Sequence, residues 1–276
     1  MVQQKKFGWL ACFFISLSLA FLGQSQVALA KTQTMIPTLF IHGWGSSYHA
    51  EEKMAQAAKK AGVTKTIILA DVDLNGNVTL KGKIPVKAKA PLVLVNFENN
   101  KNVNAKMEAG YLKSVLETLQ QKYHFQKMNL VGHSMGNMAI LDYLLENAQN
   151  KELPQLNKQV ALAAFPNGLV GEMPSDVTVA KDGRPDQETS TFTELLPLRE
   201  LYPKGASVLN IYGNLEDGSD SDGPVPVRSA QTLRYLVTPN AKSYEEHQIT
   251  GKLGQHSKLH NNREVDRLLI KFLWGK

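Results

Sequence analysis

Hydrophobic residues occur along the chain as short continuous runs that alternate with longer segments of helical periodicity. The short runs have the length and the β-branched content of buried strands, and lie at residues 36–41, 65–73, 90–97, 127–133, 159–166, 207–213 and 243–251. Amphipathic helices are predicted at residues 51–61, 102–122, 135–149 and 262–275. In the second of these, one apolar stripe recurs every fourth residue, with a second row beside it: Met107, Tyr111, Val115, Leu119, and then Leu112 and Leu116.

This alternation of strands and helices predicts an α/β fold with a mainly parallel central sheet and helices on both faces. An Asn-Gly-Asn turn signal at residues 75–77, followed by Val-Thr-Leu-Lys-Gly, predicts a small hairpin. Residues 168–203 are the exception, because they are rich in Gly, Pro, Ser, Thr and Asp and show no period. A segment this long between two strands is usually functional, so we expect a lid or cap over the carboxyl ends of the strands.

The first thirty residues differ from the rest of the chain. Lys5 and Lys6 precede an apolar run at residues 7–23, and the segment ends in Ala28-Leu29-Ala30. This pattern predicts a secretory signal peptide over residues 1–30, cleaved after Ala30, and a secreted or cell-surface domain at residues 31–276. The alternative is an uncleaved anchor, for which the apolar run is near the lower length limit.

Composition adds a few constraints. The chain has 276 residues, 43% of them hydrophobic, which suits one large domain. Its single cysteine, Cys12, lies in the leader, so the mature chain is predicted to lack disulfides and a thiol nucleophile. The net charge of +6 falls to +4 without Lys5 and Lys6, and the remaining lysines are scattered. No nucleic-acid partner is therefore expected, whereas a mild attraction to an anionic cell envelope fits the charge.

The strongest chemical signal is Gly132-His133-Ser134-Met135-Gly136 at a predicted strand–helix junction. A sharp turn there would expose the Ser134 hydroxyl, and only small flanking residues let the backbone pass so closely. The dipole of the following helix would favour an oxyanion. A merely structural turn is the alternative, but the strand and helix on either side favour a nucleophile.

Serine needs a base, and in this architecture an acid and then a histidine follow it along the chain. His247 falls in a predicted strand, whereas His256 lies in the Gly-flanked loop at residues 250–262, with His260 four residues later. His256 is favoured over His260 because it lies deeper in that loop.

The acid is expected in the loop that follows the strand at residues 207–213. That loop carries four acidic side chains: Glu216, Asp217, Asp220 and Asp222. Asp222, which precedes a Gly-Pro-Val-Pro turn, is favoured, and Asp217 is the second choice. Asp220 and Asp222 also hint at a calcium loop, but the spacing lacks the glutamate that an EF-hand requires.

The loop at residues 40–47 could supply the other oxyanion donor. The backbone N–H of Trp44, together with that of Met135, is predicted to form the oxyanion hole. His42 and His133 are expected to be structural, and Trp44 to line an acyl pocket unless it is a core aromatic.

Together these segments resemble the α/β-hydrolase superfamily, on its lipase and esterase side, and most closely its exported cell-surface members in Gram-positive bacteria. The matching stretches are FIHGWG, GHSMG, DGPVP and QHSKLHNNREVDRLLIKFL, in the family's order. The resemblance implies a Ser134–Asp222–His256 triad with an oxyanion hole at Trp44 and Met135. The acid loop departs from the simplest pattern by several extra residues between Gly213 and Asp222.

The resulting hypothesis is a secreted serine hydrolase that cleaves a small-molecule or lipid ester and needs no metal or organic cofactor. Two rivals stay open. The same triad could serve a peptidase, a thioesterase or an acyltransferase acting on cell-envelope components. Alternatively, the fold could be a catalytically silent binding module at the cell surface.

Overall fold

The computed structural model describes residue 1 and residues 35–276. The signal peptide predicted at residues 1–30 therefore lies outside the described residues, apart from Met1. None of the described helices is both long enough and apolar enough to cross a membrane.

The core of the fold is an eight-stranded sheet in the order β3-β2-β4-β1-β5-β6-β7-β8. Neighbouring strands are parallel except β2 and β3, the antiparallel hairpin predicted from the Asn-Gly-Asn turn. The strands are β1 (Thr38–Ile41), β2 (Ile67–Val72), β3 (Val78–Lys81), β4 (Leu92–Phe97), β5 (Lys127–His133), β6 (Gln155–Leu162), β7 (Ser207–Asn214) and β8 (Ser243–Thr250). The mainly parallel α/β fold is confirmed.

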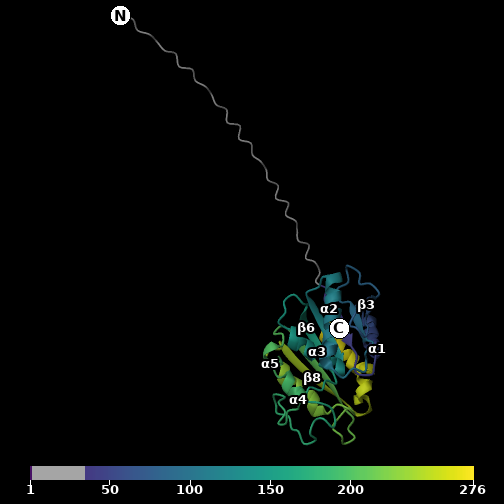
Figure 1. Ribbon diagram of the computed structural model, residues 1–276. Helices are drawn as coiled ribbons and strands as arrows, with labels where there is room; N and C mark the ends of the chain where they lie inside the picture. The colour runs from purple at the N-terminus through teal and green to yellow at the C-terminus, as the bar shows by residue number, and fades with distance from the viewer. Residues whose placement is uncertain (2–34) are drawn as a thin grey trace. The chain divides into compact units, whose positions relative to one another are not determined.

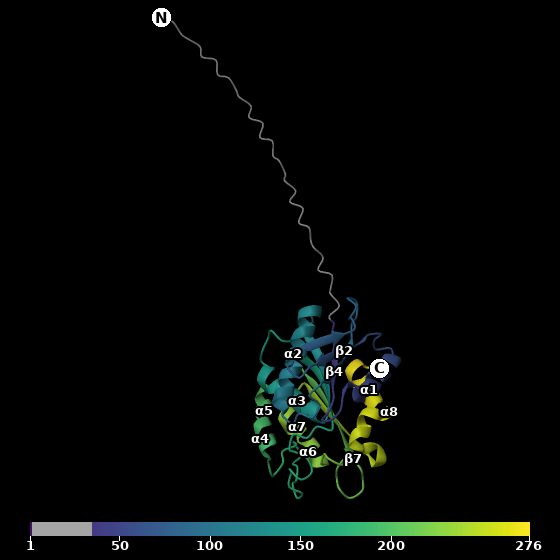
Figure 2. The ribbon, with the colours of Figure 1, turned by 45° about the vertical axis from the view of Figure 1, so that its right-hand side comes forward.

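Helices cover both faces of this sheet, with α1 and α8 on one side and α2 and α3 on the other (Figures 1 and 2). The longer helices are α1 (Tyr48–Lys60), α2 (Ala105–Tyr123), α3 (Met135–Asn147) and α8 (Arg263–Trp274). Two short helices, α6 (Val227–Gln231) and α7 (Leu233–Val237), follow the acid loop, and two 3-10 turns, η1 (Gly251–Gly254) and η2 (His256–Asn261), occupy the histidine loop.

The apolar stripe of α2 packs as predicted except at its first member. Tyr111, Val115 and Leu119 are buried against the core, but Met107 is 44% exposed. The helix begins at Ala105, where the Asn104 side chain caps it by accepting from the Met107 N–H. Met107 thus lies in the first turn of α2, two residues after the helix begins.

The aperiodic segment between β6 and β7 contains two helices that the sequence pattern did not predict, α4 (Ser190–Leu195) and α5 (Leu198–Leu201). Both are too short to show a helical period. The fully buried Asn167 joins two parts of this segment by hydrogen bonds. Its side-chain amide donates to the Gln187 carbonyl at 3.0 Å, and its side-chain oxygen accepts from the Thr189 N–H at 2.9 Å. The insertion is therefore an ordered part of the domain, and it borders the cavity described below.

Candidate active site

Ser134 occupies the corner between β5 and α3, with φ 52° and ψ −123°. Such a positive φ strains any residue other than glycine, and strain of this kind is concentrated at functional sites. Glycines make the corner possible. A Cβ at Gly136 would lie 2.5 Å from the Ile41 carbonyl oxygen, and one at Gly43 would lie 2.9 Å from the Ser134 Cβ. The sequence therefore places the corner directly against the loop that follows β1.

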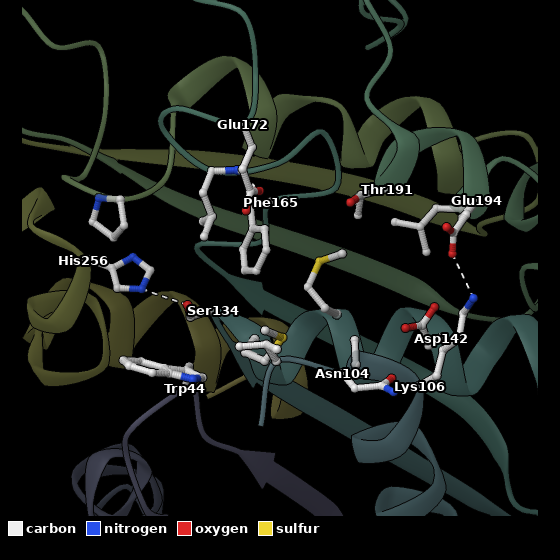
Figure 3. A pocket seen from close by; sticks show the side chains of 17 residues that line it. Trp44, Asn104, Lys106, Ser134, Asp142, Phe165, Glu172, Thr191, Glu194 and His256 are labelled. Atoms are coloured by element: carbon white, nitrogen blue, oxygen red, sulfur yellow. Dashed lines mark hydrogen bonds and ion pairs between the residues drawn. The ribbon is translucent and has the colours of Figure 1, made fainter. Parts of the chain in front are cut away.

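Three side chains from distant parts of the chain meet at this corner. The His256 Nε2 lies 2.9 Å from the Ser134 Oγ, and the His256 Nδ1 lies 2.7 Å from an Asp222 carboxylate oxygen. The first contact is drawn in Figure 3. Each residue ends or follows a strand at the carboxyl edge of the sheet, which is why parallel strands bring them together.

Asp222 is fully buried, and both of its carboxylate oxygens are engaged. One accepts from the Val225 N–H at 2.8 Å, and the other contacts His256. The second-choice acid, Asp217, is exposed and accepts instead from the Ser219 N–H. Hydrogen bonding from the Ser219 side chain, and then from this N–H, lowers the pKa of Asp217. Of the acids in this loop, only Asp222 is hydrogen-bonded to a histidine.

Asp220 likewise has other partners, since it pairs with Arg228 at 3.4 Å and accepts from the Asn214 amide. Within residues 35–276, no three His, Cys, Asp or Glu side chains cluster closely enough to hold a metal ion. The calcium alternative at Asp220 and Asp222 therefore has no structural support.

Main-chain bonds also hold the histidine loop. The His256 N–H donates to the Asp222 carbonyl at 2.9 Å, so acid and base are joined twice. The His256 carbonyl lies 3.1 Å from the His133 Nε2, which must carry the proton because a carbonyl oxygen only accepts. Burial, followed by the neighbouring His256 and His260, lowers the pKa of His133 well below its usual range.

This contact of His133 with the histidine loop was not foreseen, because residues 133 and 256 carry no local sequence signal for it. His260, the alternative base, packs its ring edge-on to His133 with ring centroids 4.9 Å apart. It makes no hydrogen bond to Ser134 among the described residues. His247 lies in β8, as predicted.

The two expected oxyanion donors lie beside Ser134. Met135 is the first residue of α3, where a backbone N–H has no acceptor within the helix. The Trp44 N–H donates to no other described group, while the Trp44 indole donates to the Lys101 carbonyl at 2.9 Å. His42 supports the same loop, since its Nδ1 contacts the Gly43 carbonyl and its Nε2 accepts from the Phe97 N–H. Neither amide therefore has an acceptor among the described residues.

A cavity of about 850 Å³ opens at Ser134. Trp44 and Phe165 lie on the side of the serine, with Glu172 beside Phe165, whereas Lys106, Asp142 and Glu194 lie at the far end (Figure 3). Trp44, 54% exposed, borders the cavity and is not a core aromatic. The insertion between β6 and β7 supplies one wall, through Leu169, Glu172, Thr191, Glu194 and Leu195.

Comparison with known proteins agrees with this architecture. The product of the lin2722 gene of Listeria innocua is 28% identical and superposes with a TM-score of 0.80, over 88% of this chain and 95% of that one. A protein described as a cell surface hydrolase, from Lactobacillus plantarum, shares 20% identity with a TM-score of 0.69, over 87% of this chain and 90% of the other. At 20% identity the second likeness concerns the fold alone.

A search of curated proteins finds no match. The family model described as "Alpha/beta hydrolase of unknown function (DUF915)" matches residues 26–276, which is nearly all of the chain. The chain belongs to this family of α/β-hydrolases.

Proposed function

We propose that the protein is a serine hydrolase that cleaves carboxylic esters, with Ser134 as nucleophile, His256 as base and Asp222 as the orienting acid. The observation that carries the proposal is the His256 imidazole, which contacts both the Ser134 hydroxyl and the Asp222 carboxylate at hydrogen-bond distance. An alcohol becomes a useful nucleophile only when a base can take its proton.

In the proposed reaction, His256 accepts the proton of Ser134 as the oxygen attacks the ester carbonyl. The backbone amides of Trp44 and Met135 stabilise the tetrahedral oxyanion. His256 then donates the proton to the leaving alcohol, and Asp222 stabilises the imidazolium between the two transfers. A water molecule, deprotonated by His256, releases the acyl group from Ser134 by the same steps. Every proton is returned within the cycle, so none of these steps requires a metal or an organic cofactor.

The cavity favours an ester with an apolar acyl group. Much of the cavity lining consists of carbon-rich or thioether side chains, among them Met135, Met138, Phe165 and Leu195. Such a lining desolvates hydrocarbon well and offers few partners for the backbone groups of a peptide. A peptidase is therefore the weaker candidate, whereas a thioesterase or an acyltransferase would use the same groups.

We further propose that the enzyme acts outside the cell or at the cell surface. The proposal depends on the leader pattern at residues 1–30 and on the solved relative from Lactobacillus plantarum that is described as a cell surface hydrolase. N-terminal sequencing of the exported protein tests it, and a first residue of Lys31 is expected.

A fluorophosphonate probe tests the nucleophile. We expect covalent labelling of the wild-type chain at Ser134 and loss of labelling in Ser134→Ala. A folded wild-type protein that stays unlabelled would indicate the silent binding module instead.

Substrate profiling separates the enzymatic alternatives. The purified mature protein would be assayed with aryl esters of graded chain length, matched thioesters, peptide amides, and an ester with an added alcohol acceptor. Hydrolysis of the oxygen esters with the highest kcat/KM supports the proposal. A higher kcat/KM for amides or thioesters, or net acyl transfer to the alcohol, would replace it.

A further inference from the structure

The far end of the cavity contains a carboxylate that the proposed chemistry does not use. Asp142 lies on α3, lines the cavity, and is only 9% exposed. Among the described residues it has no hydrogen-bond or ion-pair partner. Burial raises its pKa to about 6, so the group is mostly ionised at neutral pH. A buried carboxylate without a partner is costly unless a ligand or water satisfies it.

The surroundings of Asp142 are acidic overall. Lys106 is the nearby cation, but its ammonium pairs with Glu194 at 2.8 Å, and no ion pair joins it to Asp142. Figure 3 shows the Lys106–Glu194 contact above Asp142, at the end of the cavity away from His256. Two carboxylates, those of Asp142 and Glu194, and one ammonium group, that of Lys106, therefore line this end of the cavity. The local net charge is negative, and one further positive charge would balance it.

The helix sets the distance between this end and the nucleophile. Met135, Met138 and Asp142 follow a spacing of three and four residues, so they share one face of α3, and all three line the cavity. Asp142 is eight residues beyond Ser134, or about 12 Å at the helical rise. An extended chain spans that distance in about ten bonds.

The orientation of the triad indicates which part of the substrate fills this space. The leaving alcohol must lie on the His256 side of Ser134, because His256 donates the proton to it. The acyl group then extends the opposite way, past Met135 and Met138. Its far end comes to Asp142.

Resting on the proposed ester hydrolysis, we propose that the preferred substrates are esters whose acyl chain is apolar in the middle and ends in a protonated amine that pairs with Asp142. An ammonium group would satisfy the buried carboxylate and balance the charge beside Glu194. The methylene chain would occupy the apolar part of the cavity. A plain alkyl chain would leave Asp142 buried without a partner.

Matched substrates test the proposal. Two series of aryl esters are compared, with acyl chains of about seven to eleven carbons that end in either an ammonium or a methyl group. At the best-fitting length, we expect kcat/KM for the amine to exceed that of the methyl-terminated ester by about tenfold or more, as for a charge-assisted hydrogen bond. If no carboxylate pairs with the ammonium group, the cost of burying its charge would make the amine-terminated ester the poorer substrate at every length.

Three variants connect this preference with the acidic end of the cavity. Asp142→Asn should bring the amine-to-methyl ratio to one or below. The control Glu146→Gln, an exposed residue one turn further along α3, should keep the wild-type ratio. Lys106→Gln removes the competing cation and should increase the ratio. Circular dichroism checks that each variant is folded, and a ratio compared within one variant is independent of the amount of active protein.

The possible outcomes separate this inference from the proposed function. Equal or better hydrolysis of the methyl series at every length would overturn the amine preference and leave the esterase intact. An unchanged amine-to-methyl ratio in Asp142→Asn would do the same. A wild-type protein that neither hydrolyses any ester nor reacts with the fluorophosphonate probe would overturn both.

Discussion

Replacing Asp222 by asparagine removes the charge that faces the proposed catalytic base without changing the size of the side chain. In the native protein this carboxylate is fully buried and contacts the His256 Nδ1 at 2.7 Å. During the proposed reaction the imidazole becomes positively charged while the carboxylate stays ionised. With charge centres about 4 Å apart and an effective dielectric constant of about 20, their attraction is about 4 kcal/mol.

That attraction is present in the transition state and absent when the imidazole is neutral, so it lowers the barrier. Its loss should reduce kcat/KM by about 10³-fold. Steady-state hydrolysis of an aryl ester with a short acyl chain measures this, with thermal unfolding to check that Asp222→Asn is folded. Asp217→Asn is the matched control, since the side chain is exposed in the same loop and should stay within about twofold of wild type.

Two results would refute this reasoning. Asp217→Asn could be the variant that loses activity, which would mean that the acid has been misassigned. Alternatively, Asp222→Asn could retain nearly full activity, which would mean that the His256–Asp222 contact contributes little to the reaction.

Three further predictions concern the corner and the core. Gly43→Ala, whose Cβ would lie 2.9 Å from that of Ser134, should displace the Trp44 amide and reduce kcat/KM about 10²-fold. Ser134→Gly should relieve the strain of the positive φ and raise the free energy of unfolding by about 1 kcal/mol in guanidinium titrations, whereas Ser134→Ala should not. Burial raises the pKa of Glu51 from 4.5 to about 8, and its carboxylate has no partner. As pH rises, the unfolded chain therefore loses this proton at a lower pH than the folded protein does. The free energy of unfolding of the wild type consequently falls between pH 4.5 and about 8. Relative to wild type, Glu51→Gln should gain about 1.4 kcal/mol per pH unit in that window.

Controls keep these outcomes interpretable. An undiminished kcat/KM in Gly43→Ala would contradict the assigned oxyanion loop, and equal stabilities of the two Ser134 variants would contradict the strain. For Glu51, the difference between variant and wild type matters, because other groups also titrate. Glu117→Gln, an exposed glutamate on α2, should show no such slope, and a flat difference for Glu51→Gln would refute the raised pKa of Glu51.

Much of this fold follows from local pattern. Buried strands and amphipathic helices have strong periods, so their existence and order could be predicted, although some ends were wrong. The strand expected at residues 159–166 ends at Leu162, because Ala163 has a φ of 50° and turns the chain out of the sheet. The helices of the insertion were missed because six and four residues do not complete enough turns to show a period.

The candidate site likewise has one part that local sequence predicts and another that depends on tertiary contacts. Ser134 is recognisable because the glycines that its corner needs are its sequence neighbours. Asp217 and Asp222 could not be separated with certainty, since the choice depends on which carboxylate the folded loop buries next to His256. The roles of His133 and Asp142 depend wholly on tertiary contacts. His133 contacts a loop more than a hundred residues away, and Asp142 is notable only because it faces a cavity.

The two hydrogen bonds that join the acid loop to the histidine loop have an evolutionary consequence. The side-chain and main-chain bonds that join Asp222 to His256 belong to the sheet edge and make no use of the insertion between β6 and β7. That insertion forms one wall of the cavity through residues such as Thr191 and Glu194. Side chains such as these can be exchanged without removing either of the bonds that join Asp222 to His256. Relatives could thus diverge in substrate by changing one surface segment, with the chemistry inherited intact.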